Sequence, residues 1–208
     1  GQIDAAIKSY EKALAIKHEY PAAHNNLGNI LLDFGSLDSA VDHFEWAVAF
    51  KPDYAEAHNN LGVVERHQEK FDQAIKSFEK AIAIQPNYVQ AHSNLGNTLF
   101  QLGQLETAIT SYKKLIAIKP DYPEAYLNLG GSFQQLGKVD DAIKFYEKEL
   151  AINPNSAETY EFLCNIKKYT INKKKITKMK SLLSSDKISL SDRIHLCFAL
   201  AKVNENLD

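Results

Sequence analysis

Hydrophobic and small residues recur along this chain at a fixed spacing of 34 residues. The unit that begins at Pro21 is followed by copies that begin at Ala55, Val89 and Pro123. Each copy has a Leu-Gly pair, an Ala twelve residues after that Gly, an aromatic residue four further on and a closing Pro. The columns are Leu27, Leu61, Leu95 and Leu129; Gly28, Gly62, Gly96 and Gly130; Ala40, Ala74, Ala108 and Ala142; Phe44, Phe78, Tyr112 and Tyr146; and Pro52, Pro86, Pro120 and Pro154. This pattern is typical of stacked helical hairpins.

The columns have a physical reason. The Gly and the later Ala let the two helices of one hairpin approach closely, and we expect the aromatic and Leu side chains to fill the space between neighbouring hairpins. A single hairpin cannot bury its apolar face alone, so stacking has to supply the core. Gly35, Gly103 and Gly137 stand at the turn inside three of the units, where a helix end favours the left-handed conformation. Glu69 occupies this place in the second unit, and we expect that turn to be the least regular.

The joins between units carry possible helix starts. An Asp or Asn after the closing Pro is followed three residues later by Glu or Gln, which predicts capping boxes. These pairs are Asp53 and Glu56, Asn87 and Gln90, Asp121 and Glu124, and Asn155 and Glu158.

The five columns, held in all four copies, resemble the tetratricopeptide repeat (TPR) family. The resemblance implies an all-α fold, a right-handed α-solenoid of helix-turn-helix repeats. We expect an array over residues 1–156, with a half repeat at 1–20 and full repeats at 21–54, 55–88, 89–122 and 123–156. Residues 157–208 are interpreted as a degenerate helical extension that ends in a half repeat. We interpret the chain as part of a longer protein.

The last part of the chain has two further features. Its final thirty residues are also similar to the segment that follows the repeats in bacterial proteins with a fused sulfotransferase domain. Residues 157–208 carry ten Lys and Arg against six Asp and Glu, or +4, although the whole chain has a net charge of −2. Most of this excess lies in a lysine stretch that contains no Arg for bidentate phosphate contacts, so we predict a solvated segment and no nucleic-acid partner. The lysine stretch consists of Lys167, Lys168, Lys173, Lys174, Lys175, Lys178 and Lys180.

Composition limits the classes of protein to which the chain can belong. The chain is 45% hydrophobic and 24% charged, and it has no apolar run of the ~18 residues that a membrane span needs, so no membrane partner is expected. Cys164 and Cys197 are isolated thiols without metal or redox spacing, which favours a reducing, cytoplasmic location. We expect no cofactor and no catalytic residues.

Histidine recurs once per repeat, at His24, His58 and His92, with Tyr126 in the fourth place. Helices pack ~8–10 Å apart, whereas metal ligands have to converge at ~2 Å. A packing role is therefore predicted, and no metal site.

Asparagine forms a more informative column just before the Leu-Gly pairs. In the resembled family this face of the first helices lines the concave groove, and the column resembles the asparagine ladder with which O-linked N-acetylglucosamine transferase holds an extended peptide by its backbone. An amide offers both a donor and an acceptor to a peptide group. The alternative is that these amides satisfy neighbouring backbone within the array. The candidate groove residues are Asn25, Asn26, Asn29, Asn59, Asn60, Asn94, Asn97, Asn128, Gln101 and Gln135.

The family's carboxylate clamp for chaperone tails is not expected, because its positions hold no cation here. They are occupied by Asn25, Asn29, Asn60, Gln90 and Asn94. The sequence thus predicts a protein-interaction scaffold that binds an extended peptide. The alternative is the substrate-recruiting arm of a larger sulfotransferase or glycosyltransferase. Two arrangements are open for the ends of the chain. Head-to-tail self-association would join an apolar stripe of the first helix (Ile7, Tyr10, Leu14) to one near the other end (Ile194, Cys197, Phe198, Ala201). The alternative is that residues 1–20 pack only on the first full repeat and that the tail folds back on residues 157–190.

Overall fold

A computed structural model describes residues 2–166 and 169–205, which form twelve α-helices and no strand. The chain divides into two compact units, Gly1–Ile118 and Lys119–Asp208. Within the described ranges, none of the helices combines the length and the apolar character needed to span a bilayer.

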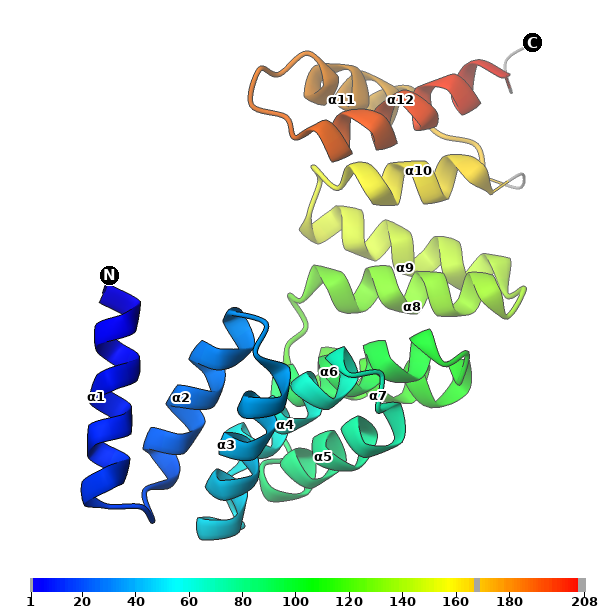
Figure 1. The fold of residues 1–208 in the computed structure, drawn as a ribbon. Coiled ribbons are helices and arrows are strands. Elements are labelled where there is room, and N and C mark those ends of the chain that lie inside the picture. Colours follow the sequence, from blue (N-terminus) through cyan, green and yellow to red (C-terminus); the bar gives the residue numbers. More distant parts are fainter. Residues whose placement is uncertain (1, 167–168, 206–208) are drawn as a thin grey trace. The chain divides into compact units, whose positions relative to one another are not determined.

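The first unit consists of one helix followed by three helical hairpins (Figure 1). Each hairpin pairs consecutive helices, and among the first helices α2 neighbours α4 and α4 neighbours α6. The bounds are α1, Gln2–Ile16; α2, Pro21–Asp33; α3, Leu37–Phe50; α4, Ala55–His67; α5, Phe71–Ile84; α6, Val89–Gln101; and α7, Leu105–Ile118.

The second unit contains one full hairpin and three further helices. The hairpin is α8 (Pro123–Gln135) with α9 (Val139–Ile152), and α10 (Ala157–Asn165), α11 (Lys173–Leu183) and α12 (Leu190–Glu205) follow. The helix that packs along α10 is α12 rather than α11 (Figure 1). It buries Leu196, Ala199 and Val203.

The glycine columns mark the closest approach within each hairpin. A Cβ atom placed on Gly28 would lie 2.7 Å from Cε1 of Phe44, and one on Gly62 would lie 2.7 Å from Cε1 of Phe78. The prediction that the aromatic column fills the space between hairpins is thus incomplete, because these rings also lie against the Gly of their own hairpin. Phe44 does both, since it belongs to a core cluster with Leu61 of the next first helix.

The turn inside each hairpin has the same geometry in all four repeats. Gly35, Gly103 and Gly137 have φ angles of 72°, 72° and 71°, and Glu69 has 59°. The Glu69 amide donates to the Arg66 carbonyl at 3.0 Å, as the Gly35 amide donates to that of Leu32 at 2.9 Å. The prediction of an irregular turn at Glu69 is therefore wrong, because the hairpin packing imposes the left-handed conformation on a residue with a side chain.

The predicted capping boxes are also wrong in position. The residues before α4, α6 and α8 are Tyr54, Tyr88 and Tyr122, and none of them makes a side-chain cap hydrogen bond. In α10 the cap is Ser156, whose Oγ accepts from the Thr159 amide. The helices start one residue later than the Asp or Asn would require, and in the first three the place directly before the helix holds a tyrosine.

Candidate functional site

The polar face of the first unit lies on its first helices, and we call it the first-helix face: Asn25 and Asn29 of α2, Glu56, Asn59, Asn60 and Arg66 of α4, and Asn94 and Asn97 of α6. Helical residues spaced by three or four positions share a face, which places Glu56, Asn59, Val63 and Arg66 on one stripe of α4. Hydrogen bonds from α4 to α2 and from α6 to α4 bring residues of three repeats together on this face.

Four asparagines on this face form a continuous chain of hydrogen bonds. Each amide donates through Nδ2 to the next oxygen, and the chain ends on a carboxylate. The steps are Asn94 to Asn59 Oδ1 at 2.9 Å, Asn59 to Asn60 Oδ1 at 3.3 Å, Asn60 to Asn25 Oδ1 at 3.0 Å, and Asn25 to Glu56 Oε1 at 3.1 Å. The amides are thus partly satisfied inside the array, as the alternative interpretation expected, but by side chains rather than by backbone.

This chain of hydrogen bonds uses only part of the donors and acceptors of the four amides. Asn25 and Asn59 are buried, so their remaining groups are not accessible to a ligand in solvent. Asn60 and Asn94 are half-buried. A primary amide has two donor hydrogens and two acceptor lone pairs, so each of these two keeps one hydrogen and at least one lone pair for another partner.

The other predicted groove residues are placed differently. Asn29 is half-buried and Asn26 is exposed, and neither side chain makes a hydrogen bond within the described residues. Asn97 accepts a hydrogen bond from the Tyr112 hydroxyl at 2.7 Å, which gives it a role in packing. Gln101 is exposed. The last two lie on α8 in the second unit, where Asn128 is half-buried and Gln135 is exposed.

Sequence reasoning missed Arg66. It is the only Lys or Arg on the first helices α2, α4, α6 and α8, and it is half-buried on the same stripe as Asn59. Burial lowers the pKa of its guanidinium. The signal is present in the sequence, because Arg66 is a single cation among otherwise uncharged or acidic first helices, and it lies outside the positions of the family's carboxylate clamp.

The histidine column holds the repeats together. In the four full repeats, and again on α10, its side chain donates a hydrogen bond to the carbonyl oxygen six residues earlier, just after the end of the preceding helix. These bonds join His24 Nε2 to His18 O at 3.0 Å, His58 Nε2 to Pro52 O at 2.9 Å, His92 Nε2 to Pro86 O at 2.9 Å, Tyr126 Oη to Pro120 O at 3.0 Å and Tyr160 Oη to Pro154 O at 3.1 Å. Both histidine and tyrosine occur in this column because both can reach that carbonyl.

The first histidine has an additional partner. His24 Nδ1 lies 2.9 Å from Nδ1 of His43, in a cluster that also holds the rings of His18, Trp46 and Phe50. Because His24 donates through Nε2, its Nδ1 accepts and His43 donates. Burial lowers the pKa of both histidines, and the charge of a protonated His24 would lower that of His43 further.

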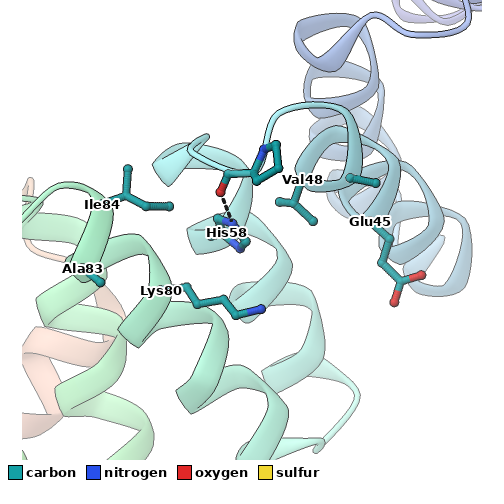
Figure 2. A pocket seen from close by; sticks show the side chains of 8 residues that line it. Glu45, Val48, His58, Lys80, Ala83 and Ile84 are labelled. Carbon is teal, nitrogen blue, oxygen red and sulfur yellow. Dashed lines mark hydrogen bonds between the residues drawn. The ribbon is translucent and has the colours of Figure 1, made fainter.

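A cleft of about 450 Å³ opens between α3 and α5 (Figure 2). His58 lies in it with its bond to Pro52, and the cleft is lined by Glu45, Val48, Ala49, Pro52, His58, Lys80, Ala83 and Ile84. The residues 102 positions after Glu45, Val48, Ala49, Pro52 and His58 line a second cleft, in which Lys174, Lys175 and Lys178 supply the other wall. Recurrence after three repeats indicates that the repeat geometry creates these clefts.

One residue of the lysine stretch makes contacts within the fold, and others are exposed. Lys175 Nζ lies 2.5 Å from Glu147 Oε2 of α9 and also contacts the Tyr169 hydroxyl. Lys173 and Lys174 are exposed, whereas Lys167 and Lys168 lie outside the described residues.

The two apolar stripes predicted to associate differ in how far their side chains are exposed. On α1, Leu14 is buried, and Ile7 and Tyr10 pack against α2. On α12, Phe198 is 63% exposed and Ile194 47%. Head-to-tail association stays a prediction.

These features define a protein of stacked helical hairpins with an amide-rich face on its first helices. Family models described as TPR repeat match residues 1–33, 28–65, 64–103 and 96–137, and one described as Tetratricopeptide repeat matches residues 123–156. The chain therefore belongs to the tetratricopeptide repeat family, and its fold class is the all-α TPR solenoid. A comparison with curated proteins finds no match.

Solved structures with the same fold include several TPR proteins. A crystal structure of MamA is 29% identical, with a TM-score of 0.71 over 74% of this chain and 91% of MamA. TTC0263, a thermophilic TPR protein of Thermus thermophilus, is 26% identical, with a TM-score of 0.58 over 76% and 87%. YrrB, described as a TPR protein with an unusual peptide-binding site, is 18% identical, with a TM-score of 0.68 over 96% and 92%; this likeness concerns the fold.

Proposed function

We propose that the chain is a protein-interaction scaffold whose first-helix face binds an extended peptide segment, and that its role is binding rather than catalysis. The observation that supports this proposal is the asparagine chain, which fixes Asn60 and Asn94 in one orientation while part of their hydrogen-bonding capacity stays unused. A peptide group has one donor and one acceptor, so it complements an amide held in this way. The matching family models, all of them repeats, and the peptide-binding site named for YrrB agree with this role.

Pre-organisation makes the proposed site effective. An amide that is already held by a neighbour loses little side-chain freedom when it binds a ligand, so more of each hydrogen bond appears as affinity. Backbone-directed contacts carry little information about side chains. The asparagines should therefore determine that an extended peptide binds, and other residues of the face should determine which one.

The test is binding of displayed peptides to the 208-residue chain. The probe is a random library of peptides of about twelve residues, which span about 40 Å when extended. Asn29→Ala is the sharpest variant, because Asn29 makes no hydrogen bond within the described residues and its loss should leave stability unchanged. We expect peptides selected on the wild type to bind this variant several-fold more weakly, as one lost hydrogen bond of about 1 kcal/mol implies.

Asn87→Ala is the matched control, because Asn87 is an exposed asparagine in the join between α5 and α6. It should leave the affinity unchanged. Failure of the wild-type chain to retain any peptide, or equal binding by the Asn29→Ala and Asn87→Ala variants, would contradict the proposal.

A further inference from the structure

Arg66 is the one strongly basic side chain on the first-helix face, and it has no partner in the part of the chain that the structure describes. Within the described residues its guanidinium makes no hydrogen bond and no ion pair. The side chain is half-buried, and burial lowers the pKa of its guanidinium with no carboxylate to offset the effect. A partly desolvated charge without a counter-ion is unfavourable in the free protein.

The two acids that share α4 with Arg66 have other partners. Glu65, next to Arg66 in the chain, accepts a hydrogen bond from the Ser77 hydroxyl of α5 at 2.7 Å. Glu56 accepts from Asn25 and lies ten residues earlier on α4, about 15 Å along the helix. The equivalent residues of the neighbouring repeats are Leu32 and Phe100, so neither flanking helix offers a carboxylate at this position.

We propose that Arg66 binds an acidic side chain, Glu or Asp, of the peptide that occupies the first-helix face. This inference rests on the function proposed above and adds the chemistry that selects the ligand. A guanidinium presents five donors in a planar fork that matches a carboxylate, and the pair is strongest in a site that is already partly dry.

The geometry of α4 sets where this acid has to lie. Arg66 follows Asn59 by seven residues, which is two helical turns and about 10 Å along the same stripe. A peptide that crosses α4 at the asparagines therefore passes to one side of Arg66. Its acidic side chain has to point toward the C-terminal end of α4, and two long side chains extended toward each other can span such a gap. The longer Glu should therefore be preferred to Asp.

The test uses the random library described above, displayed with its C-termini joined to the carrier so that only side chains supply carboxylates. Peptides selected on the wild-type chain should share a Glu or Asp at one fixed position. Substituting that acid by its amide should weaken binding to the wild type about tenfold or more, and should have no effect on binding to Arg66→Gln. Lys76→Gln, a change of an exposed lysine on α5, is the matched control and should behave as the wild type.

Several outcomes would overturn the inference. Peptides that need Asn29 for binding but carry no shared acid, or that bind Arg66→Gln as tightly as the wild type, would refute the role of Arg66 while the proposed function stands. A requirement for a free C-terminus in synthetic peptides, with no effect of the internal acid, would refute the assignment to a side chain. If the wild-type chain selects no peptide, both proposals fail. Because the peptide-side substitution leaves the protein unchanged, the test does not depend on the folding of a variant.

Discussion

Gly62→Ala should destabilise the first unit although alanine normally favours a helix. A Cβ atom at this position would lie 2.7, 2.8 and 3.0 Å from Cε1, Cδ1 and Cζ of Phe78, whereas carbon atoms in contact are normally about 3.5–4.0 Å apart. The ring is completely buried on α5, so α4 and α5 have to separate by several tenths of an ångström. Overpacking of this kind costs about 1–3 kcal/mol, which exceeds the gain of up to about 1 kcal/mol from helix propensity.

The assay is urea unfolding followed by far-UV circular dichroism, applied to a double-mutant cycle with Phe78→Leu. The smaller side chain leaves room for the new methyl group, so the double variant should lose less stability than the sum of the two single variants. We expect a coupling energy of about 1 kcal/mol, within the range found for residues in contact. A Gly62→Ala variant as stable as the wild type, or two additive losses, would refute the close-approach explanation of the glycine column.

Three further predictions follow from other parts of the structure. Glu69→Gly should raise the stability by about 1 kcal/mol by relieving a left-handed residue, and Gly103→Glu should lower it similarly; unchanged urea midpoints in both would contradict this. Burial and the neighbouring His24 lower the pKa of His43 below its ordinary value of 6.5, so the unfolded chain binds a proton first as the pH falls. The free energy of unfolding should therefore decrease as the pH drops below about 6.5. His43→Ser should reduce this pH dependence, and an identical dependence of stability on pH in the variant would contradict the prediction. The lysine stretch should bind no duplex DNA at physiological salt. Micromolar binding that weakens steeply with salt, and that is lost in the Lys173→Ala, Lys174→Ala double variant, would contradict this prediction.

The sequence predicts the repeated part of this fold well because each column of the repeat occupies a defined packing position. A Gly that faces a buried ring, as Gly62 faces Phe78, tolerates no replacement without movement, so it recurs with the period of the fold. The tail carries few of these constraints. The packing of α12 along α10 depends on which apolar faces meet, and the columns of the repeat contain no information about that.

The residue types of the candidate site can be predicted from the sequence, but the hydrogen bonds between them cannot. The asparagines bond across helices at an offset of 35 residues, one more than the repeat, so that Asn60 meets Asn25 and Asn94 meets Asn59. This offset depends on how neighbouring helices are shifted along each other, which a residue pattern does not specify. Arg66 is visible in the sequence as the one Lys or Arg on the first helices α2, α4, α6 and α8, but its lack of a partner depends on the fold, because a residue pattern does not specify which side chains meet.

The most direct test of the proposed peptide site is the magnetic resonance spectrum of the asparagine side chains. With ¹⁵N-labelled asparagine, each Nδ2 group gives its own pair of signals, which can be followed while a peptide selected from the library is added. We predict that the signals of Asn29, Asn60 and Asn94 shift on binding, and that those of Asn87 and Asn155, which are exposed at joins between repeats, stay in place. Saturable binding that moves the signals of the joins and leaves those of the first-helix face unchanged would contradict the account.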